Sequence, residues 1–302
     1  ERRLGFDPGT IRATVLIETI TAAFEMDEIL YELRERSVGL SAGRWDYIFS
    51  LARAFCEHAD FVLPDRADLG MRVPFMRAYN ELLVATCHRR GAHAIGGMAA
   101  FIPDLSDPAL TEASLAKVRS DKRHEAGDGY DGSWVAHPDL VAAARAEFDR
   151  VLGDQPNQVD RQRDDVYVTP GDLLAVRSTP GSITDDGVRT DVIIAIRYLS
   201  CWLTGTGLAA IDNRMEDLAT VELSRSQLWQ WIRHGARLED GRVITPDLVR
   251  RILAEETGRL RADIGEVGWR SGRYDEACRL FEQVSLAPDF CTFLTHPAYQ
   301  IL

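Results

Sequence analysis

Short apolar segments rich in β-branched residues alternate with amphipathic segments of helical period between residues 11 and 137. Strands are predicted at residues 11–18, 39–48, 92–98 and 134–137, of which the first is apolar on both faces. Helices are predicted between them at residues 22–33, 77–90 and 111–126, where apolar side chains recur at helical spacing. Because strands that alternate with helices form parallel sheets, this half of the chain is expected to be of the α/β class.

The pattern changes beyond residue 150, where a polar and turn-rich stretch at 153–165 predicts a linker. Nearly everything after it has helical period, with helices predicted at residues 193–203, 226–234, 246–264 and 274–286. Thr245 is a good N-cap for the third of these helices, and Pro246 suits its first position. We therefore expect an α/β domain at 1–150, a linker at 151–170 and an all-α domain at 171–302.

The α/β part is too short for a closed barrel. A complete (β/α)₈ barrel needs roughly 250 residues, and residues 1–150 supply about half of one. An open half-barrel leaves the edge of a strand unpaired, which proteins normally avoid. The sequence therefore predicts the second half of a TIM-type (β/α)₈ barrel followed by an all-α C-terminal domain, with the early barrel strands upstream of residue 1.

Composition and charge exclude several classes of protein. The formal net charge is −12 and the basic residues are interleaved with acids, whereas nucleic-acid binders usually carry a basic stripe. No apolar run approaches the ~20 residues that cross a bilayer, so no membrane association is expected. The five cysteines are widely spaced and form no CxxC pair, which favours reduced thiols in a cytoplasmic protein.

Two acids stand where a barrel places the ends of its strands. Glu18 ends the first predicted strand, and Asp46 follows the glycines Gly39 and Gly43 near the end of the second. Glycine lets backbone N–H groups approach a small anion, and carboxylates at strand ends are suitable ligands for a hard cation. Glu18 and Asp46 therefore form a candidate Mg²⁺ site, although their spacing alone is equally compatible with capping or ion-paired acids.

Six stretches of the chain, taken in order, closely resemble malate synthases of the shorter type found in bacteria and plants. They are residues 10–19, 24–34, 43–49, 88–100, 131–138 and 215–231. The resemblance covers nearly the whole chain. It identifies the sequence as the C-terminal part of such an enzyme, lacking the N-terminal region and the early barrel strands.

The resemblance implies a reaction, a cofactor and a set of site residues. The reaction is the step of the glyoxylate bypass that condenses glyoxylate with acetyl-CoA and water to give malate and CoA. Mg²⁺ is implied as the cofactor, held by Glu18 and Asp46, and Asp217 is implied as the catalytic base on a helical domain over the barrel mouth. The carboxylate of glyoxylate is implied to bind the backbone N–H groups of Gly43, Arg44, Trp45 and Asp46.

Some positions weaken or complicate this interpretation. Glu216 directly precedes Asp217, and only the resemblance selects between these two acids. The family's enolate-stabilising arginine lies upstream of the segment that matches Glu18, so we expect the chain alone to be poorly active, since one such donor is worth ~10²–10³ in turnover. Arg36 and Ser41 stand where the family typically has histidine and asparagine, which would alter hydrogen bonding around the loop rather than the type of reaction.

Other functions and sites remain as alternatives. A citramalyl-CoA or malyl-CoA lyase would share the carboxylate pair, and a non-catalytic fragment could act as a binding module. A zinc site is conceivable at His88, His93 and His137, but structural roles are favoured because their spacing is not that of metal ligands. One predicted helix carries a basic set that would face either CoA phosphates or solvent: Lys117, Arg119, Lys122 and Arg123.

Overall fold

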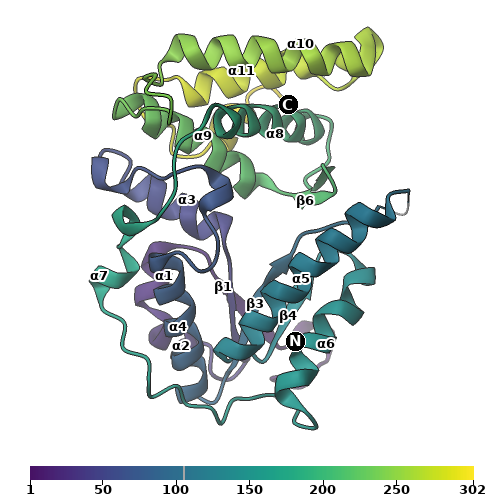
Figure 1. Ribbon diagram of the computed structural model, residues 1–302. Coiled ribbons are helices and arrows are strands. Elements are labelled where there is room, and N and C mark those ends of the chain that lie inside the picture. The colour runs from purple at the N-terminus through teal and green to yellow at the C-terminus, as the bar shows by residue number, and fades with distance from the viewer. Residues whose placement is uncertain (105) are drawn as a thin grey trace. The chain divides into compact units, whose positions relative to one another are not determined.

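The computed structural model describes residues 1–104 and 106–302, and the chain divides into two compact units. The first unit contains Glu1–Tyr47 and Phe75–Leu174, and the second contains Ile48–Pro74 and Ala175–Leu302. The chain therefore enters the second unit, returns to the first and then enters the second again (Figure 1). The sequence-based domain boundaries near residues 150 and 171 stay a prediction.

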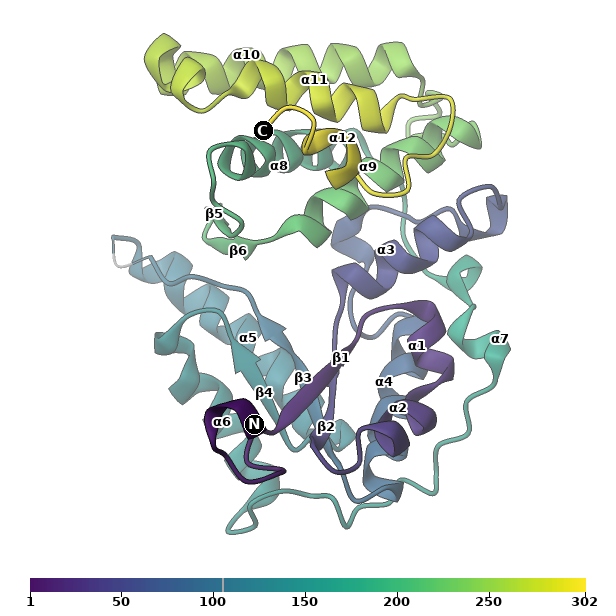
Figure 2. The same ribbon diagram turned by 180° about the vertical axis from the view of Figure 1, so that it is seen from behind.

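A parallel sheet forms the centre of the first unit and confirms the predicted α/β class. Within the described residues its strands run in the order β1 (Ala13–Ile17), β2 (Ser37–Ala42), β3 (His93–Ala99) and β4 (Gly132–Val135). The helices of this unit are α1 (Ile20–Phe24), α2 (Met26–Glu32), α4 (Pro74–Arg89), α5 (Pro108–Asp128), α6 (Val141–Leu152) and α7 (Pro170–Leu173). Helices α5 and α6 lie side by side next to β4 in both views of the molecule (Figures 1 and 2).

The second predicted strand was too long. Strand β2 ends at Ala42, and helix α3 (Trp45–Ala54) begins where the prediction continued the strand to residue 48. The side chains of Tyr47, Ile48 and Phe49 are all buried, and a short apolar run fits a buried strand as well as a buried helix. The helix predicted at 22–33 is also divided, because α1 ends at Phe24 and α2 starts at Met26, with Glu25 between them.

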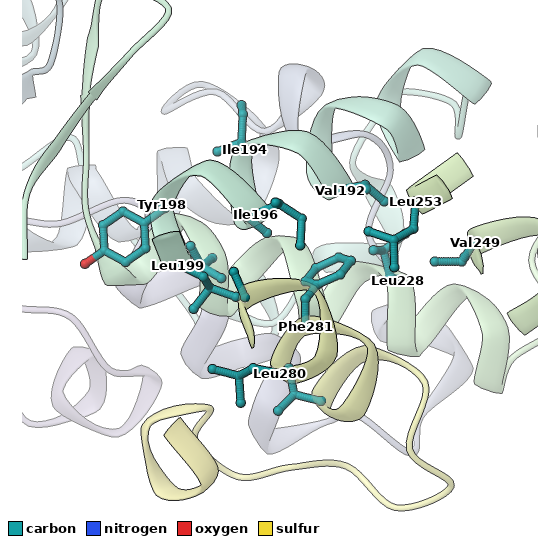
Figure 3. Close-up of a cluster of buried hydrophobic side chains, with 14 of the residues drawn as sticks. Val192, Ile194, Ile196, Tyr198, Leu199, Leu228, Val249, Leu253, Leu280 and Phe281 are labelled. Atoms are coloured by element: carbon teal, nitrogen blue, oxygen red, sulfur yellow. The ribbon is translucent and has the colours of Figure 1, made fainter. Parts of the chain in front are cut away.

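Four long helices enclose the core of the second unit. They are α8 (Asp185–Leu203), α9 (Leu218–Arg233), α10 (Pro246–Ser271) and α11 (Tyr274–Ser285). Figure 3 shows their apolar side chains meeting in one cluster, among them Val192, Ile196, Leu199, Leu228, Val249 and Phe281. Short elements complete the chain: η1 (Arg2–Leu4), η2 (Ala59–Phe61), η3 (Arg66–Asp68), η4 (Pro138–Leu140), η5 (Val176–Ser178) and α12 (Thr295–Ala298).

A small hairpin in the second unit was not predicted. Strands β5 (Ala209–Ile211) and β6 (Arg214–Glu216) pair antiparallel around Asp212 and Asn213, whose φ angles are 49° and 59°. Aspartate and asparagine tolerate this left-handed conformation better than most residues, which is what a tight two-residue turn demands. Helix α9 then starts at Leu218 rather than at residue 226, because its buried polar side chains hide the helical period.

The segment between Ile48 and Pro74 is built into the helical unit through its backbone. On α9, the side chains of Gln227, Gln230 and Trp231 donate hydrogen bonds to the carbonyl groups of Pro64, Phe61 and Leu63. Asp65 accepts hydrogen bonds from the N–H and hydroxyl groups of Thr184, the N-cap of α8. This segment therefore forms part of the helical core rather than a loop on the barrel.

No helix in the described part of the chain is long and apolar enough to cross a membrane. All five cysteines are unpaired.

A buried hydrogen-bond cluster around Asp131 joins three segments of the first unit. Its carboxylate accepts from the N–H groups of Ala94 and Gln158 at 2.8 and 2.7 Å, and lies 3.1 Å from Nε2 of His88. Nδ1 of the same histidine lies 2.6 Å from the carbonyl oxygen of Arg161. Burial alone would raise the pKa of Asp131, but these hydrogen bonds outweigh it and hold the pKa below its usual value.

This cluster predicts a loss of stability in acid. A carboxyl group with a depressed folded-state pKa stabilises the fold above its unfolded pKa of about 4, and this contribution disappears as the pH falls through the folded value. The unaltered chain should therefore be more stable than Asp131→Asn at pH 6, with the gap shrinking between pH 4 and pH 2. Urea unfolding followed by circular dichroism measures this gap, and Asp139→Asn, at an exposed acid, is the control. A gap that does not change with pH would contradict the assignment.

Candidate functional site

The register of β1 against β2 brings Glu18 next to Gly43. Ile17 pairs with Ala42 at the end of the ladder, so Glu18 and Gly43 are the next residues along two neighbouring parallel strands. A Cβ atom on Gly43 would lie 2.5 Å from Cγ and 2.6 Å from Oε1 of Glu18. A larger residue at position 43 would therefore displace the Glu18 side chain from this strand end.

Asp46 lies in the first turn of α3, three residues after Gly43. The first N–H groups of a helix lack intrahelical acceptors, and the helix dipole favours an anion beside them. The guanidinium of Arg44 lies over the ring of Trp45 at 3.9 Å, which orders the side chains at the start of the helix. The turn that carries Asp46 thus offers a place for a small carboxylate.

The hydroxyl of Tyr79 lies between the two strand ends. It accepts a hydrogen bond from the N–H of Gly43 at 2.9 Å and donates one to the carbonyl of Ile17 at 2.7 Å. The N–H of Gly43 is therefore already engaged within the protein. A bound carboxylate has to rely on the N–H groups of the residues that follow it.

The donor set suits magnesium. Among the described residues, no group of three or more His, Cys, Asp and Glu side chains is placed to hold a metal ion. Mg²⁺ is commonly held by only one or two carboxylates, with water and substrate oxygens completing its octahedron. Glu18, in the space left by Gly43, and Asp46, in the adjacent turn, fit this pattern.

Asp217 is the N-cap of α9 and belongs to the second compact unit. Its Oδ1 accepts a hydrogen bond from the N–H of Ala219 at 3.0 Å, which fixes the orientation of the carboxylate. The side chain is only partly buried.

Glu216 is held inside the helical unit. It is 5% exposed, and the hydroxyl of Thr220 donates to its Oε2 at 2.6 Å. The guanidinium of Arg66 lies 3.9 Å from the same oxygen and 3.8 Å from Oδ1 of Asp191. One arginine therefore pairs with two buried carboxylates, of which Glu216 directly precedes Asp217 in the chain.

Burial raises the pKa of Asp191 to about 7, although the charge of Arg66 and a hydrogen bond from Ser224 both favour its ionised form. Its Oδ2 has no hydrogen-bond partner among residues 1–104 and 106–302. Sequence reasoning missed Asp191, Arg66 and Tyr79. The available signals were an acid within the apolar run of α8, and an arginine directly after Leu63-Pro64-Asp65.

Three of the other candidates, Lys122, His88 and His137, are engaged within the protein. Lys122 is neither on a solvated face nor available to phosphates, because it is buried and its Nζ lies 3.0 Å from Glu125. His88 is enclosed by Asp131 and the carbonyl of Arg161. Nδ1 of His137 accepts a hydrogen bond from the N–H of Asp139.

The two departures from the family pattern lie in different places. Arg36 precedes the amino end of β2 and contacts Glu1, about 20 Å of strand away from Gly43. It is therefore not adjacent to the loop, contrary to the prediction. Ser41 is buried in β2, where it pairs with Leu16 and Ile95.

Comparison with known proteins identifies relatives along the whole chain. The family model "Malate synthase, TIM barrel domain" matches residues 1–176, and "Malate synthase, C-terminal" matches residues 182–302. Malate synthase of Streptomyces clavuligerus is 57% identical over 100% of this chain and 56% of that protein. Malate synthase A of Escherichia coli K12 is 45% identical over 100% of this chain and 56% of that protein. The chain thus spans a little over half the length of these relatives.

Similarity to solved structures is weaker. A Haloferax volcanii malate synthase, solved as a magnesium/glyoxylate complex, is 15% identical with a TM-score of 0.43, covering 90% of this chain and 60% of that chain. A structural similarity at this level supports no conclusion about the ligands of the 302-residue chain.

Proposed function

Because the chain belongs to the malate synthase family, we propose that it carries the magnesium site, the glyoxylate site and the catalytic base of an enzyme that condenses glyoxylate with acetyl-CoA. The products are malate and CoA. One observation carries this proposal: Glu18 and Gly43 lie side by side at the ends of two adjacent strands. Asp46 follows Gly43 by three residues. A cytoplasmic location stays a prediction from the sequence.

Glu18 and Asp46 are the residues that would hold Mg²⁺. When bound, the ion supplies Lewis acidity that polarises the aldehyde of glyoxylate. The two carboxylates balance its charge and leave positions for water and for substrate oxygens. Gly43 contributes the space for the Glu18 side chain.

The start of α3 would orient glyoxylate. Its carboxylate meets backbone N–H groups at the helix N-terminus, where the helix dipole stabilises negative charge. We assign this role to the N–H groups of Arg44, Trp45 and Asp46, because the N–H of Gly43 donates to Tyr79. These donors orient the substrate without using a charged side chain.

Asp217 would remove a proton from the methyl group of acetyl-CoA. Its Oδ1 is held by the N–H of Ala219, so Oδ2 is the oxygen that takes the proton. Glu216 is unsuited to this role because it is buried and engaged with Thr220 and Arg66. A thioester α-proton is only weakly acidic, so the developing enolate needs a hydrogen-bonding or positive partner beyond this base.

Binding of glyoxylate to the 302-residue chain is expected to require Mg²⁺. In Glu18→Gln, we expect the affinity for Mg²⁺ to fall by more than the ~10–100-fold that outer-shell changes cost, because a charged ligand is lost. Titration calorimetry of glyoxylate with and without Mg²⁺ measures the first effect, and titration of Mg²⁺ into the unaltered chain and Glu18→Gln measures the second. Glu28→Gln, at an exposed acid of α2, is the matched control.

Glyoxylate binding that is unchanged without Mg²⁺ or in Glu18→Gln would remove the support for this site. Release of free thiol from acetyl-CoA and glyoxylate separates the proposed activity from that of a citramalyl-CoA or malyl-CoA lyase. A lyase forms or breaks the carbon–carbon bond without hydrolysing the thioester.

A further inference from the structure

One buried hydroxyl connects the two strand ends of the candidate site. Tyr79, on α4, has none of its surface exposed. Its oxygen accepts from the N–H of Gly43 and its proton is donated to the carbonyl of Ile17. Ile17 is the residue before Glu18, and the Glu18 side chain fills the space that a Cβ atom of Gly43 would occupy.

These bonds occur where the two chains leave the sheet. Ile17 and Ala42 are the last paired residues of the β1–β2 ladder, after which one chain continues to Glu18 and the other turns toward Asp46. Beyond this point the separation of the chains depends on contacts from outside the ladder. The Tyr79 hydroxyl is such a contact, and it comes from a helix rather than from either strand.

The ring of Tyr79 adds a second link to the same turn. It stacks on the ring of Tyr47 with a centroid distance of 4.2 Å and an interplanar angle of 25°. Tyr47 directly follows Asp46 in the first turn of α3. Tyr79 therefore contacts both flanks of the turn through its hydroxyl and its ring.

We propose that Tyr79 is a positioning residue whose hydroxyl sets the separation between the strand ends that carry Glu18 and Asp46. This inference rests on the proposed function, because it assigns Tyr79 to the metal site of that function. Two carboxylates hold one small cation only when their oxygens are correctly spaced, since Mg²⁺ demands near-octahedral geometry at short distances. Without the hydroxyl, the buried Gly43 N–H and Ile17 carbonyl lose a shared partner, and the two ends relax independently.

The chain offers a matched control for the loss of a buried hydroxyl. Tyr130 is equally buried in the first unit, and its hydroxyl donates to Oδ1 of Asn80 on the same helix α4 at 2.7 Å. This hydrogen bond involves neither Ile17 nor Gly43. Tyr130→Phe therefore removes a buried tyrosine hydroxyl without removing either hydrogen bond of Tyr79.

The test measures binding of Mn²⁺ alone, as a paramagnetic substitute for Mg²⁺, to the 302-residue chain. Electron paramagnetic resonance of free Mn²⁺ gives the dissociation constant for the unaltered chain, Tyr79→Phe and Tyr130→Phe. We expect a ~10–100-fold weaker affinity in Tyr79→Phe and no change in Tyr130→Phe. Urea midpoints of the two variants should fall by similar amounts, which shows that the loss of affinity is specific to the site.

Equal affinities in the unaltered chain and Tyr79→Phe would overturn the positioning role while leaving the metal site intact. An equal loss in both variants would also overturn it, because the effect would then be structural. If the unaltered chain does not bind Mn²⁺, the proposed function fails and the positioning role with it. If Tyr79→Phe does not fold, amide exchange at Gly43 in the unaltered chain decides: slow exchange supports the bond, and rapid exchange overturns the proposal.

Discussion

Residues 175–302, produced without residues 48–74, are expected to lack a cooperative unfolding transition. Three side chains of α9 would lose their backbone acceptors in the missing segment: Gln227, Gln230 and Trp231. Each buried donor left unpaired costs ~1–3 kcal/mol, against a typical domain stability of ~5–15 kcal/mol. Helix α8 would also lose the contact of Asp65 with its N-cap Thr184.

The measurement is urea unfolding followed by circular dichroism on two proteins. One is the fragment 175–302 alone, and the other has residues 48–74 fused to its amino end through a flexible glycine-serine linker. We expect a cooperative transition only in the fusion, and not in a control fusion with a scrambled 48–74 sequence. Cooperative unfolding of the fragment alone would instead support the division of the chain near residue 171.

Replacing Arg66 by methionine is expected to destabilise the helical unit by ~3 kcal/mol. The side chains of Arg66, Asp191 and Glu216 are 12%, 1% and 7% exposed, so the change leaves two buried carboxylates without their cation. Removing one partner of a buried ion pair costs more than the pair itself contributes, because the remaining charge stays desolvated. The expected loss lies at the low end for buried pairs, since Asp191, whose pKa burial raises to about 7, can bind a proton instead.

Because Asp191 can bind a proton, the destabilisation caused by Arg66→Met depends on pH. With Arg66 present, burial raises the pKa of Asp191 to about 7, so this carboxyl is mostly protonated at pH 5 with or without the guanidinium. Loss of the guanidinium favours the protonated form further, so the extra cost of ionising Asp191 arises above about pH 7. Arg66→Met should therefore destabilise the protein more at pH 8 than at pH 5, and adding Asp191→Asn should recover part of the loss. Urea midpoints at the two pH values measure this.

Arg233→Met is the control for the loss of an arginine. Its pair with Glu57 is exposed, at 51% and 54%, and exposed pairs contribute little to stability. We expect no measurable change in the midpoint at either pH. An effect of Arg66→Met that is equally small, or equal at both pH values, would show that the two carboxylates do not depend on this guanidinium.

Much of the fold could be predicted from local patterns. The apolar run before Glu18 and the helical period of residues 77–90 correspond to β1 and α4. In α4 the period records a buried face, whereas in β1 only Ile17 is buried although the strand is apolar. The capping pattern Thr245-Pro246 correctly placed the start of α10. The end of β2 was missed because strand and helix are both buried there, and the β5–β6 hairpin because each strand has only three residues.

Some residues of the candidate site could be predicted from the sequence, and others could not. Glu18, Asp46 and Asp217 were identified through motifs that are continuous in the sequence, and their roles remain proposals. Tyr79 and Arg66 were not identified, because neither belongs to a motif and each acts on residues distant in the chain. Tyr79 lies 62 positions from Ile17, with which it shares a hydrogen bond.

The sequence by itself determined the α/β and helical halves, the family, and the acids on which a reaction could depend, because these are recorded in periodicity and in continuous motifs. Only the tertiary structure decided that residues 48–74 belong to the helical core, that Arg66 pairs with Asp191 and Glu216, and that one tyrosine hydroxyl spans two strand ends. The physical reason is that hydrogen bonds and charge pairs depend on distances in space, to which residues far apart in the chain contribute without any local pattern.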